Sequence, residues 1–590
     1  MKRRVADIIM DILVENNITD CFAVVGGGAM HLDNALALNQ KINKVFNHNE
    51  QACAMAAEAY ARLSGKMASV CVTSGPGATN TLTGVMGAWQ DSLPMIVISG
   101  QVRYQISIEK SGLPLRYRGI QEYNIVPAVK HMTKYAVMLT DPLAVKKEMY
   151  KALSIAMDGR RGPVWIDVPQ DIQSAVVEED ELYQIEETEH NYPDVDIDSV
   201  MEVLSTSQRP CILAGSGIRS GDVMSEFLDF AERQQIPVIG GSWVADVMYM
   251  EHPLFFGPSG NVGPRTGNFI LQNADTILVL GCSLGFRQTG FNQEAFAPKA
   301  RIIMVDADEN EPKKPGLNIE LFVHSDLKRF FDVFKDKKIR TSITTQWCDY
   351  CNNLKKRFSA YEALEQLDMD CIVNSYYFWK IFEEKASSDI IVSLGNNSAN
   401  TAKLQIGVQK KEQRVITNYT CGSMGYDLPA AVGSAVASGK KVICVTGDGS
   451  IMMNLQELQT IKHYDLPINI VVFSNDGYGA IRQTNKNFFN GVYIGCNAET
   501  GVSFPDFELV ANAFGFEYVK CSSNAELMEK IDVIFSSEKR VLLEVEQMFD
   551  NPVTPKLMSR LDENGKMLTP ELHDMTPFLS KEELDSIMYK

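Results

Sequence analysis

The chain has 590 residues and a formal net charge of −18, and 45% of its residues are hydrophobic. This length and apolar content predict three or four domains with sizeable cores, while the acidic balance excludes the basic surface of a nucleic-acid-binding protein. No apolar run approaches the length of a membrane span. The twelve cysteines do not indicate a disulfide framework in a chain this long and are typical of a reducing cytoplasm.

Four blocks follow one another along the chain. The opening MKRRVADIIMDILVENN is predicted to form an amphipathic helix and not a signal peptide, because acidic residues interrupt its apolar run. Strand-like runs then alternate with helical stretches, the pattern of α/β domains with parallel sheets. The predicted boundaries are 1–175, 190–340 and 366–548 for three α/β domains and 551–590 for a C-terminal tail. An isolated CxxC at Cys348 and Cys351 has no histidine at zinc spacing, so we expect two helical cysteines.

The stretch VFNHNEQACAMAAEAYAR, at residues 45–62, predicts an alanine-rich buried helix with one carboxylate, Glu50, near its start. The simplest interpretation is structural. Asn49 is a good N-cap, and an acidic side chain in the first turn suits the helix dipole. Evidence for a chemical role of Glu50 has to come from the rest of the sequence.

A pattern in the first block recurs in the third. SVCVTSGPGATN and KVICVTGDGS each indicate a strand followed by a glycine-rich loop and a helix, and each unit then runs through a Leu-Pro pair into the next strand. Two such units in one chain suggest a duplicated α/β module.

The third block differs from the first where chemistry could lie. Asp448 in GDGS follows one predicted strand, and Asn475 in NDGYG follows the next. Because the carboxyl ends of neighbouring parallel strands open onto the same crevice, we expect the two side chains to lie close together. An acid, an amide oxygen and a loop carbonyl would make half of an oxygen shell for Mg²⁺, which takes its other ligands from substrate phosphates and water.

These motifs, with VVGGGAM, GPVWIDVPQDIQ and MGYDLPAAVG, resemble the thiamine diphosphate enzymes of the acetohydroxyacid (acetolactate) synthase, pyruvate oxidase and benzoylformate decarboxylase group over nearly the whole chain. The resemblance implies a pyrimidine-binding first domain, a central domain and a diphosphate-binding third domain. It also implies that the cofactor bridges two subunits, so the working unit is a homodimer or homotetramer.

By this resemblance Glu50 is the acid that contacts the aminopyrimidine ring of the cofactor. The family has His-Glu-Gln here, whereas this chain has an extra residue after His48, so His48 is out of register. The other candidate catalytic residues are Gly27 and Gly28 in VVGGGAM and Gln121, whose amide would face pyruvate. The resemblance assigns Asp448, Asn475 and the carbonyl of Gly477 to Mg²⁺. The further candidate contacts to the cofactor are Asn396, Asn397, Gly422, Met424, Gly447, Gly449, Ser450, Tyr478 and Gly479, with Met424 as the apolar wedge that bends the cofactor.

The central domain resembles the FAD-binding domain of the synthases. The candidate FAD residues are Gly215, Gly217, Gly260, Gly263, Arg287 and Asp306. Three residues of the matching segment depart from the family, because Ser283, Gly285 and Phe286 replace an arginine and two aspartates. Glycine loops are common in α/β turns in any case, so FAD is a prediction that rests on the resemblance.

The substrate end departs most from the synthases, because Gln170 replaces their lysine and Thr484 replaces their tryptophan. The tail resembles synthase-like proteins found with surface-polysaccharide genes. We therefore predict a carboligase that decarboxylates pyruvate and transfers the two-carbon acetyl (hydroxyethyl) unit to a nucleotide-linked keto-sugar or to a second 2-keto acid. We also predict that the tail acts as a lid. The alternatives are a simple 2-keto acid decarboxylase that releases aldehyde and a degenerate regulatory homologue, against which the retained Glu50, Asp448 and Asn475 speak.

Overall fold

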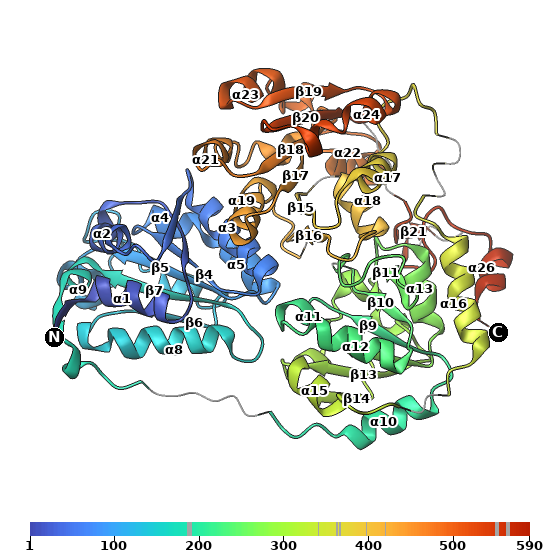
Figure 1. Ribbon diagram of the computed structural model, residues 1–590, viewed down its shortest axis with the longest axis horizontal. Helices are drawn as coiled ribbons and strands as arrows, with labels where there is room; N and C mark the ends of the chain where they lie inside the picture. The colour runs from blue at the N-terminus through green and yellow to red at the C-terminus, as the bar shows by residue number, and fades with distance from the viewer. Residues whose placement is uncertain are drawn as a thin grey trace.

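The computed structural model describes residues 1–185, 192–242, 244–339, 342–361, 364, 367–396, 398–418, 420–548, 554–561 and 567–589. These residues form three six-stranded parallel sheets, each surrounded by helices, in three lobes that together outline a triangle (Figure 1). The predicted α/β class with three parallel-sheet units is therefore confirmed. Among the described helices, none has the length and apolar character that crossing a membrane requires.

The first sheet has the strand order β3-β2-β4-β5-β7-β6. Its strands are β2 (Asp20–Ala23), β3 (Asn43–Phe46), β4 (Ala68–Val72), β5 (Met95–Gln101), β6 (Tyr135–Met138) and β7 (Pro163–Pro169). Its helices are α1 (Val5–Glu15), α2 (Met30–Leu38), α3 (Glu50–Ser64), α4 (Pro76–Asn80), α5 (Leu82–Gln90), α6 (Ile108–Ser111), α7 (Val126–Val129), α8 (Val145–Met157) and α9 (Gln170–Ser174). The short strands β1 (Lys2–Arg4) and β8 (Val176–Glu178) pair antiparallel beside it.

The central sheet has the order β11-β10-β9-β12-β13-β14. Its strands are β9 (Pro210–Ala214), β10 (Val238–Gly240), β11 (Phe255–Pro258), β12 (Thr276–Leu280), β13 (Arg301–Asp306) and β14 (Leu321–His324). Its helices are α10 (Ile197–Thr206), α11 (Gly217–Ser220), α12 (Met224–Gln234), α13 (Arg265–Asn273), α14 (Phe286–Thr289), α15 (Leu327–Phe334) and α16 (Thr345–Arg357). Cys348 and Cys351 both lie in α16, as predicted.

The third sheet has the order β16-β15-β17-β18-β20-β19. Its strands are β15 (Ile391–Leu394), β16 (Arg414–Ile416), β17 (Val442–Gly447), β18 (Ile468–Ser474), β19 (Glu517–Cys521) and β20 (Val541–Glu546). Its helices are α17 (Ser375–Lys385), α18 (Ser398–Ile406), α19 (Asp427–Ser438), α20 (Asp448–Ile451), α21 (Glu457–His463), α22 (Gly479–Phe488), α23 (Phe507–Phe514), α24 (Asn524–Lys530) and α25 (Val533–Ser536).

The first and third sheets connect their strands in the same order, so β4 and β5 of the first correspond to β17 and β18 of the third. This agrees with the repeated pattern in the sequence. The inner strands are continuous apolar runs because parallel strands are covered on both faces; β5, for example, is buried along its whole length. In each sheet the strand order reverses at one point, between β2 and β4, between β9 and β12 and between β15 and β17. Such topological switch points are where α/β proteins bind ligands.

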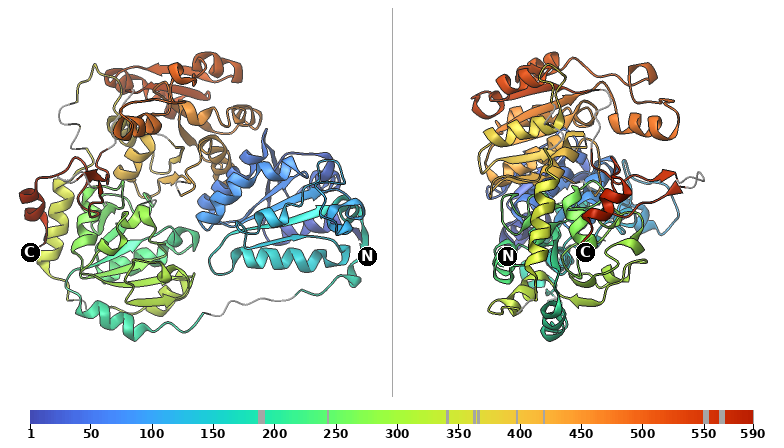
Figure 2. Two further views of the ribbon diagram at one scale, coloured as in Figure 1. Left: turned by 180° about the vertical axis from the view of Figure 1, so that it is seen from behind. Right: turned by 90° about the vertical axis from the view of Figure 1, so that its right-hand side faces the viewer.

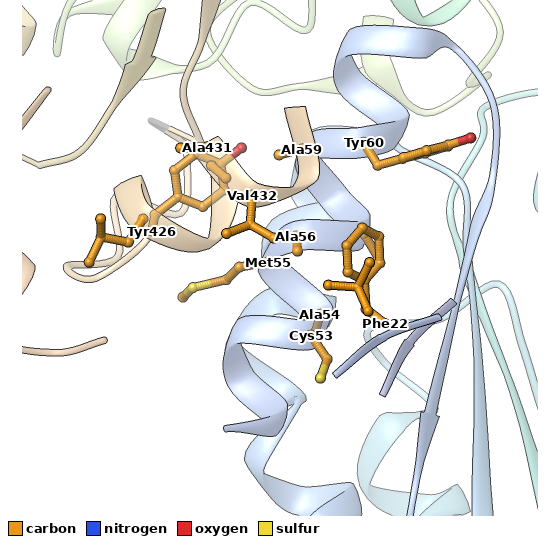
Figure 3. Close-up of a cluster of buried hydrophobic side chains, with 14 of the residues drawn as sticks. Phe22, Cys53, Ala54, Met55, Ala56, Ala59, Tyr60, Tyr426, Ala431 and Val432 are labelled. Atoms are coloured by element: carbon orange, nitrogen blue, oxygen red, sulfur yellow. The ribbon is translucent and has the colours of Figure 1, made fainter. Parts of the chain in front are cut away.

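The alanine-rich helix α3 is the centre of the contact between the first and third sheets. Its Ala56 and Ala59 face Ala431 and Val432 of α19 (Figure 3). The two helices approach so closely that a Cβ atom on Gly433 would lie 2.0 Å from the carbonyl oxygen of Ala56. Small side chains are therefore required at this contact, which explains the run of alanines.

The described part of the tail, with β21 (Arg560–Leu561), β22 (Met567–Leu568) and α26 (Lys581–Ile587), lies beside α13 and α16 of the central sheet (Figure 2). Leu557 and Leu572 belong to the apolar core there, and Arg357 of α16 pairs with Glu583 at 2.7 Å. The Tyr589 ring packs edge-on against Trp347. These tail residues are thus anchored to the central sheet, and a lid function for the tail stays a prediction.

The α3–α19 contact predicts the effect of adding a single methyl group. Gly433→Ala should lower the free energy of unfolding by about 1–3 kcal/mol, because the new methyl overlaps the Ala56 carbonyl. Chemical denaturation measures this. Gly87→Ala is the matched control, since Gly87 also lies within a helix but its Cβ would meet no atom closer than 3.7 Å. Equal stabilities of the two variants would contradict the packing argument.

Candidate active site

Asp448 and Asn475 lie side by side at the carboxyl edge of the third sheet. Asp448 follows the last residue of β17, and Asn475 follows the last residue of β18, the parallel neighbour of β17. The backbone N–H of Asn475 donates to Oδ2 of Asp448 at 2.9 Å. The structure therefore brings together the two residues that the sequence pattern pairs.

Three backbone N–H groups orient the Asp448 carboxylate. Besides Asn475, Gly477 donates to Oδ2 at 3.2 Å and Gly449 donates to Oδ1 at 2.7 Å. Burial raises the pKa of Asp448 to about 6, while these hydrogen bonds and the charge of the buried Arg482 act in the opposite direction. The carboxylate is thus held in one orientation before any ligand binds.

The side-chain oxygen of Asn475 is a buried acceptor to which none of the described residues donates a hydrogen bond. Such a group is rare in a folded protein and calls for an explanation, which a bound cation supplies. Gly477, at φ +153°, completes the set with its carbonyl, and no larger residue fits there because a Cβ would lie 2.0 Å from the Cys496 carbonyl oxygen. One carboxylate, one amide and one carbonyl suit Mg²⁺, which prefers oxygen ligands. No cluster of three His, Cys, Asp or Glu side chains in the described residues offers another metal site.

Met424 and Tyr478 close around Gly449, the residue after Asp448. A Cβ on Gly449 would lie 2.3 Å from the Tyr478 ring and 3.3 Å from the Met424 methyl group. Gly479, which begins α22, lies against the Asn475 amide. These four candidate cofactor contacts, from three separate segments, therefore converge on one site.

Two further candidates have hydrogen bonds within the protein. The Ser450 hydroxyl donates to Asp427 at 2.6 Å and accepts from the Gly425 N–H, so its side chain is already used. The Gly422 carbonyl accepts from the Asn396 amide at 2.9 Å, which joins two candidates predicted separately. Gly447 is the last residue of β17. Asn397 lies outside the described residues.

Glu50 begins α3, and the Asn49 side chain caps the helix by accepting from the Gln51 N–H. The structural interpretation of this stretch is thus confirmed. In addition, the Asn80 amide donates to Oε2 of Glu50 at 2.9 Å, and a Cβ on Gly77 would lie 3.4 Å from Oε1. The half-buried carboxylate therefore points toward the glycine-rich turn after β4.

The other candidates of the first sheet gather around the same turn. The Gly28 N–H donates to the Thr73 hydroxyl at 2.9 Å, and a Cβ on Gly75 would lie 2.2 Å from the Gln121 carbonyl oxygen. The Gln170 amide donates to the Gly27 carbonyl at 2.6 Å. Glu50, Gln121 and the two glycines thus share the switch point between β2 and β4.

Several neighbours of the site had no signal in the sequence. The buried Glu457 of α21 accepts from the His48 N–H at 3.1 Å and so holds the turn before Glu50, while the His48 side chain is exposed. Arg482 lies behind the metal-site loop and donates to the Asn475 carbonyl at 3.0 Å. Asp427, which accepts a hydrogen bond from the Ser450 hydroxyl, lies in the MGYDLPAAVG motif, and its acidic side chain there is a sequence signal for this contact.

The central sheet has a cavity of about 540 Å³ at its switch point, between β9 and β12. Gly215, Gly217, Arg287 and Asp306 line it, four of the six candidates for FAD binding. Burial raises the pKa of Asp306 to about 6. The other two candidates, Gly260 and Gly263, are not among its lining residues.

Gly260 and Gly263 instead form a turn that contacts the tail. A Cβ on Gly260 would lie 2.6 Å from the Arg287 carbonyl oxygen, and one on Gly263 would lie 2.4 Å from the Ser259 backbone. Between them, Asn261 accepts from the Leu557 N–H at 2.6 Å. Tight packing thus explains these glycines without a ligand.

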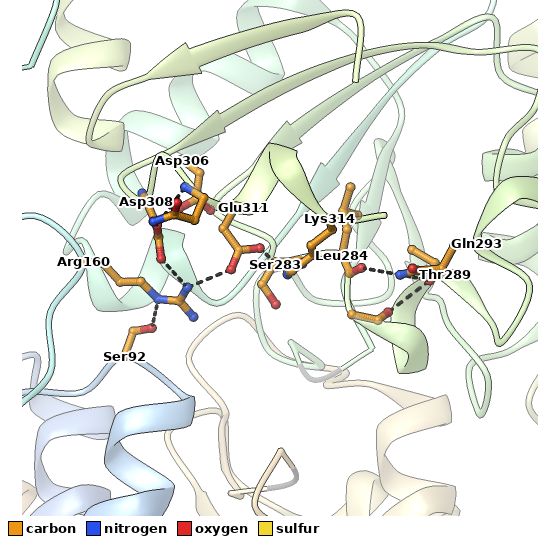
Figure 4. Close-up of polar contacts among 12 residues, drawn as sticks. Ser92, Arg160, Ser283, Leu284, Thr289, Gln293, Asp306, Asp308, Glu311 and Lys314 are labelled. Carbon is orange, nitrogen blue, oxygen red and sulfur yellow. Dashed lines mark hydrogen bonds and ion pairs between the residues drawn. The ribbon is translucent and has the colours of Figure 1, made fainter. Parts of the chain in front are cut away.

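Arg160 reaches from the first lobe to the edge of this cavity (Figure 4). Its guanidinium donates to the Ser92 hydroxyl at 2.8 Å, to Glu311 at 2.8 Å and to Asp308 at 3.2 Å. The cavity therefore lies at a contact between the first and central lobes, closed in part by this ion-pair network.

Comparison with known proteins agrees with this arrangement. The thiamine pyrophosphate enzyme family matches in three parts: its N-terminal TPP binding domain over residues 3–114, its central domain over 197–333 and its C-terminal TPP binding domain over 393–545. These matches together cover more than half of the chain, which therefore belongs to the thiamine pyrophosphate enzymes and depends on thiamine diphosphate.

Within this family the chain is similar to acetolactate synthases over nearly its whole length. It is 28% identical over 542 residues to the acetolactate synthase isozyme 2 large subunit of Escherichia coli, covering 92% of this chain and 95% of that protein. It is 29% identical over 581 residues to the chloroplastic acetolactate synthase of Arabidopsis thaliana (94% and 83%), and 29% over 554 residues to the large subunit from Lactococcus lactis (92% of each).

The free amide oxygen of Asn475 predicts a binding defect. Asn475→Ala should weaken the joint binding of Mg²⁺ and thiamine diphosphate by at least about 10- to 100-fold, the loss that follows even from changing an outer partner of a metal ligand. Isothermal titration calorimetry measures it. The control is Asn487→Ala, which removes an exposed amide from α22. Unchanged affinity in Asn475→Ala would contradict the metal assignment.

Proposed function

We propose that this chain is a carboligase that takes pyruvate as donor, releases CO₂ and transfers the remaining two-carbon unit to an acceptor carbonyl. The similarity to acetolactate synthases supports the reaction class. The observation that carries the proposal is the buried, partnerless oxygen of Asn475 beside the oriented Asp448 carboxylate, since this set of oxygens fits a Mg²⁺–diphosphate group.

The candidate residues of the third and first sheets would form two half-sites, one for the diphosphate and one for the pyrimidine ring. Asp448, Asn475 and the Gly477 carbonyl would hold Mg²⁺ and through it the diphosphate, while Met424 would support the cofactor from its apolar side. Glu50, with one oxygen held by Asn80, would exchange a proton with the pyrimidine ring at its carboxylate. The bound thiamine diphosphate supplies the electron sink for decarboxylation.

A subunit interface would join these half-sites, as a homodimer or homotetramer. The rim of each half-site carries large exposed apolar side chains: Ile120, next to Gln121, is 89% exposed, and Ile494, near the Cys496 carbonyl that faces Gly477, is 76% exposed. Apolar groups gathered at a functional rim are typical of surfaces that an assembly covers. The twelve free cysteines suit the cytoplasm, which we propose as its location.

The acceptor is either a second 2-keto acid or a nucleotide-linked keto-sugar. Thr484 is exposed on α22, and its hydroxyl donates to the Ala480 carbonyl at 3.1 Å, so a small polar group stands where the synthases carry a tryptophan. Beside it, Gln483 accepts from Lys556 of the tail at 2.6 Å. More space and a tail residue at this wall favour an acceptor bulkier than 2-ketobutyrate.

Product analysis tests the proposal. With pyruvate, thiamine diphosphate and Mg²⁺, a panel of 2-keto acids and nucleotide-linked keto-sugars should yield a carbon–carbon coupled product by mass spectrometry. A preference for 2-ketobutyrate over pyruvate should be absent, since one methylene in an apolar pocket is worth only about 1–3 kcal/mol even with a tight wall. Free acetaldehyde as the sole product would favour the alternative, a simple 2-keto acid decarboxylase.

We also propose FAD for the central cavity. Its position at the switch point of the central sheet and its lining by Gly215, Gly217, Arg287 and Asp306 support a dinucleotide. No chemistry of the proposed reaction requires electron transfer through it, so its role would be structural.

Flavin content tests this second proposal. The purified protein should show flavin absorbance and release FAD on denaturation. Ala307→Trp, which adds bulk to the lining of the cavity, should weaken or abolish binding of added FAD, whereas Lys299→Trp adds the same bulk at an exposed position and should not. A colourless protein that also fails to bind added FAD would contradict the proposal that the cavity binds FAD.

A further inference from the structure

A loop between β5 and α7, residues 104–122, forms one wall of the turn that gathers the first-sheet candidates. It contains a 3₁₀ turn at Tyr104–Ile106 and α6, and then runs without regular structure to Gln121. From Gly112 to Arg118 every residue is exposed. Such a loop needs specific anchors to keep one conformation, because little of it is buried.

Glu122 supplies the main anchor at the far end of this loop. Its Oε1 accepts from the Ile108 N–H at 2.5 Å, and its Oε2 accepts from the N–H groups of Arg118 and Gly119 at 2.7 and 2.8 Å. A single carboxylate thus binds the start of α6 and the last stretch before Gln121. Hydrogen bonds to a charged acceptor are stronger than neutral ones, so this clasp determines the shape of the loop.

Further contacts align the two ends with the sheet. Asp171 of α9 accepts from the Tyr104 N–H at 2.7 Å, and Arg118 donates to the Ser107 carbonyl at 3.1 Å. After the clasp, the Tyr123 carbonyl accepts from Gln101 of β5 at 2.8 Å. The loop is therefore closed on itself and fixed at both ends.

The clasp has a direct consequence for Gln121. This residue adopts φ +59°, a conformation that a glutamine rarely takes, and its carbonyl presses against Gly75. Local strain of this kind persists only where the surroundings determine it. The neighbouring Glu122, with its three backbone hydrogen bonds, is the group that holds it.

We propose that Glu122 is a positioning residue of the carboligase reaction: its clasp holds loop 104–121 and keeps Gln121, whose amide we expect to face pyruvate, over the Gly75 turn. This inference rests on the proposed function. It assigns Glu122 to the capture of pyruvate and not to the activation of the cofactor, which we propose for Glu50 at the same turn.

Kinetics with pyruvate test the assignment. Glu122→Ala should raise the pyruvate KM by about 10- to 100-fold, the effect of a small misplacement at a distance from the chemistry. The exchange rate of the C2 proton of bound thiamine diphosphate should change little. Glu122→Gln, which keeps one acceptor oxygen, should have a pyruvate KM between those of the wild type and Glu122→Ala, and it replaces Glu122→Ala in the test if that variant does not fold.

The matched control is Glu109→Ala. It removes the same charge from the same loop, but among the described residues Glu109 accepts only from the Asn124 amide, in an exposed contact of 2.9 Å, so the pyruvate KM should stay at the wild-type value. A second measurement needs no cofactor. Amide hydrogen exchange of residues 108–119 in the apo protein should be faster in Glu122→Ala and unchanged in Glu109→Ala.

The outcomes separate the inference from the proposed function. A wild type that couples no acceptor overturns the proposed function, and the inference with it. A wild type that couples, together with a Glu122→Ala variant that has faster amide exchange but an unaltered pyruvate KM, overturns the inference alone. Unaltered amide exchange in Glu122→Ala would show that the hydrogen bonds of Glu122 do not hold the loop in its conformation.

Discussion

The close packing of α3 against α19 is the constraint on which the rest of the structure depends. The absence of a side chain at Gly433 lets the two helices meet almost backbone to backbone at Ala56. Beside this contact the fully buried Glu58 of α3 accepts from Arg62 and from the Tyr426 hydroxyl. A buried carboxylate is tolerated only when it is paired and hydrogen-bonded, so this network also fixes how the first and third lobes meet.

The same interface sets the position of the turns that carry the candidate catalytic and cofactor-binding residues. Asn454 donates both to Gln51, the neighbour of Glu50, and to the carbonyl of Gly425, the neighbour of Met424. Glu457 accepts from the turn that precedes α3. The start of the helix that carries Glu50 and the loop that carries Met424 are thus tied to a common set of side chains, and neither can move without disturbing the packed helices.

The sequence predicted the parts that local chemistry determines. The strands after which Asp448 and Asn475 stand, the glycine turns and the alanine-rich helix all follow from short patterns. Residues that act through long-range contacts were not predictable: Asn80 on Glu50, and Glu122, whose three donors come from elsewhere in its loop. A residue's partners depend on the folded backbone and leave no periodic signal.

The glycines of the central domain also show why a sequence pattern alone does not identify a binding residue. Gly217 and Gly260 occupy similar glycine-rich segments, yet only the first lines the central cavity, while the second is required by close packing against Ser242 and Arg287. A glycine in a βα turn indicates a close approach without telling whether a ligand or the protein itself makes it. The anchoring of the tail on α13 and α16 likewise depends on side chains, such as Trp347 and Tyr589, that are far apart in the sequence.

We propose that Glu50, held at the start of α3, controls a proton of the cofactor. The most direct test is the hydrogen–deuterium exchange of the C2 proton of bound thiamine diphosphate in Glu50→Gln, followed by NMR. We expect that the cofactor still binds while exchange slows by about 10²–10⁴-fold, the usual contribution of a positioned acid or base. An exchange rate equal to that of the wild type would contradict it and leave Glu50 as a helix-start residue alone.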